Sequence, residues 1–275
     1  MKDISFINIE TEHKGKLMIA KMLCFEVSLS YQQKTHTIYF FIDTGSSGSM
    51  LFPYSINLAQ VDLQFPKEEE YQKIYIHKFG NVSIEKEFKI RIDFNAQLVQ
   101  ASDKPIPCGI IGNDILKNYA LNINYSKKTF QLYGQNEKEY RYSCMFHFYK
   151  NFIFLYAKVN KVELKFIYDT GYDTNGKFSF FERGFNKINS GKYKSDEKET
   201  TPGAFGIVYE IDLYPQKIKL HFSDELIYES DFAVMKDNKM TDLVDCDGII
   251  GNDLFLNREL SINYLSQKIS FSEIK

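Results

Sequence analysis

The chain has 275 residues, of which 44% are hydrophobic, so it can bury a core large enough for one bilobed domain or two small ones. Its 34 basic and 36 acidic residues leave a net charge of −2. Without a basic excess to neutralise phosphates, a nucleic acid is not an expected partner. Aromatic residues make up 16% of the chain, and this composition favours strands over helices.

The predicted elements of the first half are mostly strands. Residues 38–42 are apolar at both alternating sets of positions, which is typical of a strand buried on both faces. Residues 88–94 alternate between apolar and charged side chains and predict a half-exposed strand. A short helix over 115–119, capped by the Asn or Asp just before it, and a closing strand over 121–125 follow.

The second half repeats these predictions in the same order. Residues 164–168 form a second apolar strand, and 218–222 alternate between apolar and basic side chains. A short helix is expected over 254–258 and a closing strand over 260–264. The sequence therefore predicts a mainly-β chain with two short helices.

An internal duplication underlies this repetition. Residues 109–125 (GIIGNDILKNYALNINY) and 248–264 (GIIGNDLFLNRELSINY) are identical at 11 of 17 positions. Upstream of each copy stands an Asp-Thr-Gly triplet, at 43–45 and at 169–171. We therefore expect an N-terminal unit over 1–138 carrying Asp43 and a C-terminal unit over 139–275 carrying Asp169, joined by a polar linker near 135–139.

The duplicated triplet suggests a pair of cooperating carboxylates. An apolar strand delivers each Asp to its end, and the Gly lets the chain turn sharply and lets another backbone come close. One such turn is an ordinary structural feature, but two copies in a duplicated chain would face each other across a pseudo-twofold axis. Two such carboxylates would share one proton, and the pair could then act as base and acid together.

This set of motifs resembles the aspartic proteases of the pepsin and retropepsin clan. In those proteins an apolar stretch precedes Asp-Thr-Gly, and an apolar-apolar-Gly motif follows later in the same lobe; here residues 110–112 and 249–251 match that second motif. The resemblance covers both halves. It implies a mainly-β, bilobed acid-protease fold of two pseudo-symmetric β-barrel-like lobes, each with a short helix. It also implies hydrolysis of peptide bonds by a water activated between Asp43 and Asp169, the pair that is the standard example of a shared proton.

The resemblance assigns further roles to residues of the two turns. Thr44 and Thr170 become the threonines whose hydroxyls brace the opposite lobe. The backbone N–H groups of Gly45 and Gly171 become the donors that steady the carboxylates. Ser46 follows the first triplet and could donate a hydrogen bond to Asp43, whereas the second triplet is followed by Tyr172, so the two carboxylates are inequivalent.

The second motif carries structural residues. Gly112 and Gly251 belong to the loops that interlock beneath the active site of the family. Asp114 and Asp253, which follow two residues later, are interpreted as capping the next helix and locking the loop, and not as catalytic groups.

Members of the family cover the active site with a glycine-tipped hairpin, called the flap. The second half offers residues 201–207, with Gly203 and Gly206 at the tip. The first half offers residues 74–81, with Tyr75 as a candidate flap tyrosine and Gly80 at the turn. The sequence leaves open which half supplies the working flap.

Several other readings were weighed. Residues 171–177 nearly match a phosphate loop, but Phe178 stands where a Ser or Thr is required to bind Mg²⁺. A glycosidase with paired carboxylates would not explain why both acids sit in duplicated turns. No cofactor and no metal site are expected. Four distant cysteines, Cys24, Cys108, Cys144 and Cys246, are expected to be buried free thiols, with disulfides left open.

A peptide or protein substrate is the expected partner, and a monomer is expected because both lobes lie in one chain. A non-catalytic peptide-binding module with the same fold is the alternative function, and a self-processing or regulatory protease is a third. No run of apolar residues is long enough to span a membrane, and the N-terminus does not resemble a signal peptide. The compartment is open: cytoplasmic as the sequence is written, or exported if a leader has been removed.

Overall fold

Strands dominate the computed structural model of the chain. It describes residues 5–13, 16–80, 82–94, 105–125, 127, 129–133, 139–172, 177–188, 191–202, 208–236, 244–255 and 258–273, with side chains from Leu23 onward except at 201, 202 and 208. The mainly-β prediction is confirmed. Both apolar entry strands are present as expected, because Phe40, Ile42, Phe166 and Tyr168 are fully buried.

Six strands of the first half close into a barrel, which we call the N-terminal barrel. They follow one another around it as β2 (Lys16–Tyr31), β3 (Lys34–Ile42), β7 (Pro107–Ile111), β4 (Met50–Leu51), β6 (Val82–Ile92) and β5 (Tyr71–Phe79), and β5 pairs back with β2. Strand β1 (Ser5–His13) pairs with β2 from Cys24 outward, so this part of the hairpin projects beyond the barrel. The end it projects from is the one where β3 stops before Asp43.

The second half repeats this strand order in the C-terminal barrel. Its ring is β12 (Phe152–Val159), β13 (Val162–Tyr168), β18 (Gly248–Ile250), β14 (Phe178–Phe181), β17 (Ile227–Met235) and β16 (Val208–His221), closed by one β12–β16 pair. Strands β11 (His147–Tyr149) and β15 (Glu197–Pro202) flank it. Each pairing has the same sense as its counterpart: β3–β7 and β13–β18 are parallel, for example, and β4–β7 and β14–β18 are antiparallel.

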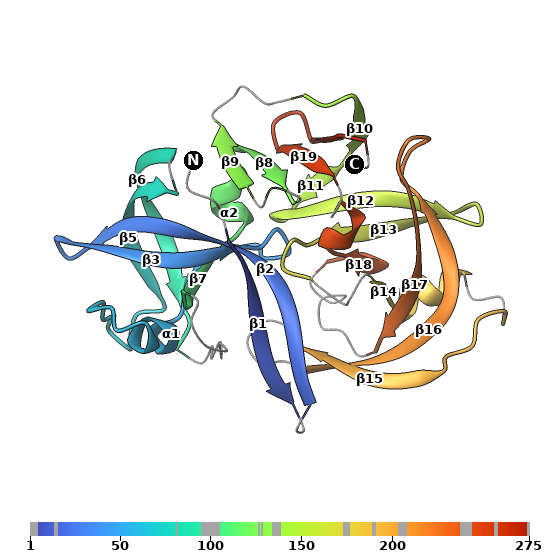
Figure 1. Cartoon of the computed structure of the whole chain (residues 1–275), viewed down its shortest axis with the longest axis horizontal. Helices are drawn as coiled ribbons and strands as arrows, with labels where there is room; N and C mark the ends of the chain where they lie inside the picture. Colours follow the sequence, from blue (N-terminus) through green and yellow to red (C-terminus); the bar gives the residue numbers. More distant parts are fainter. Residues whose placement is uncertain are drawn as a thin grey trace.

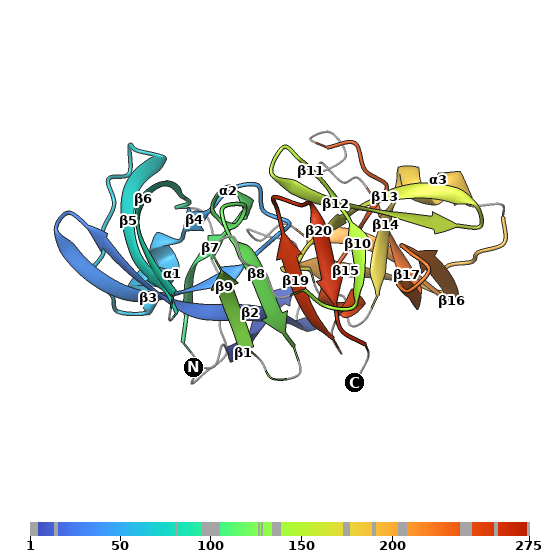
Figure 2. The same cartoon turned by 90° about the horizontal axis from the view of Figure 1, so that it is seen from above.

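A third sheet joins the two halves. Its order is β10 (Tyr142–Met145), β20 (Lys268–Phe271), β19 (Glu259–Asn263), β8 (Ala120–Asn124) and β9 (Thr129–Tyr133). Strands β8 and β19, which are the closing strands of the two repeats, pair antiparallel at its centre. The barrels lie at opposite ends of the long axis and this sheet lies between them (Figures 1 and 2).

The helices are short and only partly match the predictions. Helix α2 (Asn113–Leu116) and the 3₁₀-helix η2 (Asn252–Leu254) each begin two residues earlier than predicted. The residues at their N-caps are Gly112 and Gly251, so no side chain caps either helix. Helices α1 (Pro53–Leu58) and α3 (Glu182–Ile188) were not predicted, because six or seven residues carry too little periodicity to be seen. No helix in the described ranges has the length and apolar character needed to cross a bilayer.

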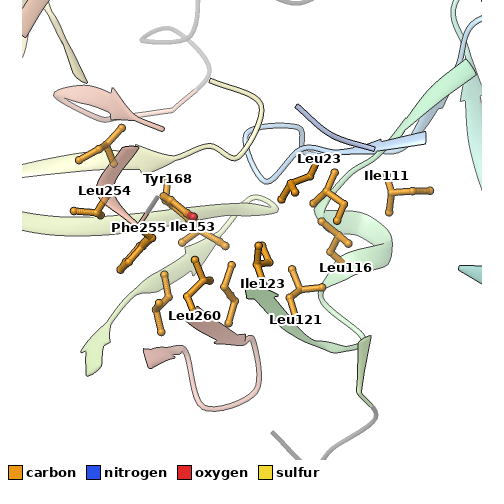
Figure 3. Packing of buried hydrophobic residues seen from close by; sticks show 14 of the residues in the cluster. Leu23, Ile111, Leu116, Leu121, Ile123, Ile153, Tyr168, Leu254, Phe255 and Leu260 are labelled. Carbon is orange, nitrogen blue, oxygen red and sulfur yellow. The ribbon is translucent and has the colours of Figure 1, made fainter. Parts of the chain in front are cut away.

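The largest apolar cluster of the described residues runs from one barrel to the other. Figure 3 shows side chains of both halves packed together there, with Leu116 and Ile123 from the first half and Tyr168, Phe255 and Leu260 from the second. All five are fully buried. Burial of a side chain of this size stabilises a fold by about 1.5–3 kcal/mol, so this shared core opposes separation of the two halves.

Candidate active site

The two Asp-Thr-Gly turns leave equivalent strands and are held alike. Asp43 follows β3 and Asp169 follows β13, each at the end of a buried strand. The backbone N–H of Asp43 donates to the carbonyl of Ile111 at 3.1 Å, and that of Asp169 donates to Ile250 at 3.0 Å. The Gly-Ile-Ile-Gly copies therefore fix the starting point of each turn.

The carboxyl groups of Asp43 and Asp169 lie against each other: a Cβ atom on Gly171 would lie 3.2 Å from Oδ1 of Asp43 and 3.1 Å from Oδ1 of Asp169. A Cβ atom placed on Gly45 would lie 2.1 Å from Cγ of Asp169, and one on Gly171 would lie 3.0 Å from Cγ of Asp43. Each glycine therefore leaves the space that the other half's carboxyl group occupies. Asp43 is buried, with 7% of its surface exposed, whereas Asp169 is half-buried.

Burial and proximity change the proton affinity of the pair. Burial raises the pKa of Asp43 well above its ordinary value, and repulsion from the facing Asp169 raises it further. Burial also raises the pKa of Asp169, but hydrogen bonds from Asp43 and from backbone N–H groups stabilise its ionised form. Two carboxyl groups that interact this closely titrate as a pair, and they share one proton between them.

The two threonines brace the turns against each other. The N–H of Thr44 donates to Oγ1 of Thr170 at 3.0 Å, and the N–H of Thr170 donates to Oγ1 of Thr44 at 2.9 Å. The hydroxyl of Thr44 then donates to the carbonyl of Tyr168, and that of Thr170 donates to Ile42. Both threonines are fully buried. This reciprocal contact between the halves is the one that the resemblance implies.

Backbone N–H groups steady both carboxylates, also as the resemblance implies. Gly45 donates to Oδ1 of Asp43 at 2.9 Å, and Gly171 donates to Oδ1 of Asp169 at 2.6 Å. The next residue in each turn contributes its N–H to the same carboxyl group. The charge of the pair is therefore held by fixed dipoles in a largely buried site.

The side chains that follow the triplets point elsewhere. The hydroxyl of Ser46 donates to the carbonyl of Gly48 at 2.7 Å and not to Asp43 as expected, because that carbonyl lies within the same tight loop. The phenol of Tyr172 donates to Oγ of Ser179 on β14. The hydroxyl contacts described for these two side chains are therefore made with other partners, and Asp43 and Asp169 differ in how far they are exposed.

The glycine and aspartate of the second motif lock the loops. A Cβ atom on Gly112 would lie 2.7 Å from the carbonyl oxygen of Gly48, and one on Gly251 would lie 2.0 Å from that of Tyr172. Oδ1 of Asp114 accepts from the hydroxyl of Ser49 at 2.6 Å and from the N–H of Ile115. Asp114 thus locks the loop from inside the first turn of α2 and does not cap it; Asp253 occupies the matching turn of η2.

The candidate flap residues of the first half lie away from the carboxyl pair. Tyr75 on β5 pairs with Ser30, which pairs with Thr35 at the far end of β3, eight residues or about 26 Å of strand from Asp43. Its ring packs against His77, whose imidazole bonds to Ser30. Gly80 turns the β5–β6 hairpin with a φ of 56° and donates to the carbonyl of Glu26. Tyr75 is therefore a surface strand residue in this structure.

The candidate flap of the second half belongs to the hairpin of β15 and β16. Its last described pair is Pro202 with Val208, and Gly203 and Gly206 lie outside the described residues. In Figure 1 this hairpin and β1 lie on the side of the molecule away from the five-stranded sheet.

Two functional candidates were missed by the sequence reasoning. The side-chain amide of Asn113 donates to the carbonyl of Thr44 at 2.6 Å, and that of Asn252 donates to Thr170 at 2.6 Å. Both asparagines are identical in the two repeats, and that identity was the available signal. It could not show that the amides reach back to the Asp-Thr-Gly turns.

The remaining candidates from the sequence concern metal binding, the cysteines and a phosphate loop. Within the described ranges, no three His, Cys, Asp or Glu side chains converge in a way that could hold a metal ion. The four cysteines are buried free thiols. Most of the near-match to a phosphate loop, residues 173–176, lies outside the described residues.

Comparisons with known proteins add no family. A scan against protein-family models finds no match, and a search of curated proteins finds no relative of the chain. The case for a function therefore rests on the residues and on their geometry.

Proposed function

We propose that the chain is an aspartic-type endopeptidase, which hydrolyses peptide bonds with a water activated between Asp43 and Asp169. One observation carries the proposal: two turn carboxyl groups, one from each half, lie against each other in a largely buried site, where repulsion between them raises the pKa of Asp43. The repeated six-strand ring and the reciprocal threonine brace support a bilobed acid-protease fold.

The geometry suggests how the work is divided. Asp169 takes a proton from the water as its oxygen attacks the peptide carbonyl carbon, and Asp43 gives its proton to the carbonyl oxygen. The resulting tetrahedral diol collapses when Asp169 passes its proton to the leaving nitrogen and Asp43 recovers one from a hydroxyl. The C–N bond breaks, and both carboxyl groups return to their starting state.

The braces supply pre-organisation. Threonine hydroxyls, turn N–H groups and asparagine amides fix the position of both carboxyl groups before a substrate arrives. A well-oriented catalytic group avoids the entropy cost of being brought into place during the reaction. Because one chain carries both carboxyl groups, we propose that it acts as a monomer on a peptide or protein substrate.

The test is the Asp43→Asn variant, assayed against a broad peptide library between pH 3 and 7. The change keeps the shape of the side chain but removes the proton exchange, so cleavage should fall by about 10²–10⁴-fold. Circular dichroism should show that the variant stays folded. Cleavage at the wild-type rate would refute the proposal.

A non-catalytic peptide-binding module is the second candidate, and it is favoured by the described hydroxyl contacts of Ser46 and Tyr172, which are not made with a carboxyl group. A hydroxyl in the matching position of the first turn is contributed by Ser46, whereas the phenol of Tyr172 is directed to Ser179. A pepstatin-like transition-state mimic separates the two functions. Tight binding of the mimic without cleavage of any library peptide would favour the module, whereas binding together with cleavage would favour the peptidase.

A further inference from the structure

Two buried tyrosines cross between the halves below the carboxyl pair. Tyr125 directly follows β8 in the first half, and its phenol donates to Oδ1 of Asn252 in the second half at 2.5 Å. Tyr264 directly follows β19 in the second half, and its phenol donates to Oδ1 of Asn113 in the first half at 2.6 Å. All four side chains are buried. The contact is therefore reciprocal, like the threonine brace above it.

Each asparagine passes this contact on to a catalytic turn. The amide of Asn113 donates to the carbonyl of Thr44, which is the residue after Asp43, and also to the carbonyl of Asn151 at 2.9 Å. The amide of Asn252 donates to the carbonyl of Thr170. Each threonine is thus held at its N–H and hydroxyl by the opposite turn and at its carbonyl by an asparagine. The orientation of that asparagine depends on a tyrosine of the opposite half.

We propose that Tyr125 and Tyr264 are positioning residues, which hold the two carboxyl-bearing turns in register through Asn252 and Asn113; this inference rests on the proposed peptidase function. Without the phenol, the amide oxygen has lost a buried donor and the amide is free to rotate. Rotation would release the threonine carbonyl and let the turn drift. A shift of about 1 Å can cost a catalytic site on the order of 100-fold in rate.

The two tyrosines are not equivalent. The phenol oxygen of Tyr125 also lies 3.4 Å from that of Tyr168, the fully buried residue just before Asp169. Ile42 occupies the matching place before Asp43 and has no hydroxyl group to offer Tyr264. Loss of the Tyr125 phenol should therefore disturb the turn of Asp169 through two routes, and loss of the Tyr264 phenol should disturb that of Asp43 through one.

The test compares Tyr125→Phe and Tyr264→Phe with the control Tyr140→Phe. The phenol of Tyr140 also links the halves, through Asn122 on β8 and Glu259 on β19, so its described contacts lie in the five-stranded sheet. We expect kcat to fall about 10- to 100-fold in the first two variants, with KM within about twofold. The pH profile of kcat should become narrower. Carboxyl groups that are held less closely interact less strongly, so the two apparent pKa values of the pair lie closer together. Tyr140→Phe should leave kcat and the profile unchanged.

Unchanged kcat and pH profile in folded Tyr125→Phe and Tyr264→Phe would overturn the proposal, and so would an equal loss of kcat in Tyr140→Phe. If one of the two variants does not fold, the other carries the test. Carbon-13 NMR titration of the aspartate carboxyl groups, with Asp43→Asn for assignment, gives a readout that needs no substrate. If the wild-type chain cleaves nothing, the proposed function fails. In that case the carboxyl titrations alone test the tyrosine brace. The brace is supported if the two titration steps lie closer together in pH in the phenylalanine variants than in the wild type, and it is refuted if their separation is unchanged.

Discussion

Asp43 leaves the N-terminal barrel and Asp169 leaves the C-terminal barrel through turns with matching backbone hydrogen bonds. Their surroundings differ, because Asp43 is 7% exposed whereas Asp169 is half-buried. Ser46 and Tyr172, which follow the two triplets, also make different contacts. The repeated backbone therefore brings the two carboxyl groups together, while their immediate surroundings in the two halves differ.

The hairpins that lead into the barrels differ as well. In the second half, β11 and β12 are joined by a tight turn at Lys150 and Asn151, both with positive φ. Asn151 reaches the first half, where its amide donates to the carbonyl of Ser47 at 3.0 Å. In the first half, β1 and β2 extend well beyond the barrel. The duplicated units therefore diverge in their edges and agree around the carboxyl pair.

We expect the largest effect at the turn glycines, where substitution by alanine should lower activity unequally in the two halves. Gly45→Ala would force a methyl group to within 2.1 Å of Cγ of Asp169, whereas the closest carboxyl atom to the methyl group of Gly171→Ala lies at 3.0 Å. We expect Gly45→Ala to lower kcat/KM on the order of 100-fold or more and Gly171→Ala about tenfold. Steady-state cleavage of one peptide measures both. Equal losses would remove this difference between the halves.

The two threonines should instead behave alike. Thr44→Val or Thr170→Val removes a hydroxyl that bonds one backbone N–H and one backbone carbonyl, and both groups stay buried. Each change should lower the free energy of unfolding by about 2–5 kcal/mol, because each leaves two backbone groups without a partner. Urea denaturation measures the loss. A large difference between the two variants would contradict a symmetric brace.

The pH dependence of stability tests the buried pair. Because burial raises the pKa of both Asp43 and Asp169, the folded chain keeps the shared proton at pH values where the unfolded chain has lost it. This contribution to stability is fully present below about pH 4 and is lost as pH rises through the folded pKa. Asp43→Asn should therefore be more stable than the wild type at pH 7, and its advantage should shrink toward pH 4.

Thermal unfolding at several pH values measures this difference. The control is Asp62→Asn, since an ion pair with Lys34 lowers the pKa of the exposed Asp62 carboxyl. That variant should show a small effect of the opposite sign. A stability of Asp43→Asn that follows the wild type at every pH would mean that the pair is not strained by its charge.

The smallest effects are expected at the residues after the triplets. Ser46→Ala loses a hydrogen bond within its own loop, and Tyr172→Phe loses the bond to Ser179. Each should cost about 1 kcal/mol of unfolding free energy and leave kcat within a few-fold of the wild type. Peptide cleavage measures the effect on kcat. A loss of 100-fold in either variant would show that its hydroxyl acts on a carboxyl group.

The sequence was sufficient where the duplication could be seen. The buried strands before Asp43 and Asp169 follow from their apolar runs, and the pairing of the two turns follows from the order of the repeated motifs. Contacts that depend on three-dimensional distance could not be predicted. The crossing of Tyr125 to Asn252 joins residues 127 positions apart, and only the fold brings them together.

Two other features depend on strand register and loop conformation, which local sequence patterns do not show. Residues 74–81 were expected to form a hairpin; residues 74–80 lie in the hairpin of β5 and β6, Asn81 lies outside the described residues, and only strand register shows that Tyr75 lies at the far end of the barrel. The hydroxyl of Ser46 was expected to donate to Asp43, but the conformation of the loop brings it to the carbonyl of Gly48. Composition and spacing do not encode either choice.

The central claim is that two halves of one chain jointly make one catalytic pair, and cleavage of a single peptide by Asp43→Asn and Asp169→Asn tests it most directly. The account predicts that each variant stays folded and loses about 10²–10⁴-fold in kcat/KM, because neither carboxyl group can serve as both acid and base alone. Wild-type cleavage by either folded variant would contradict it.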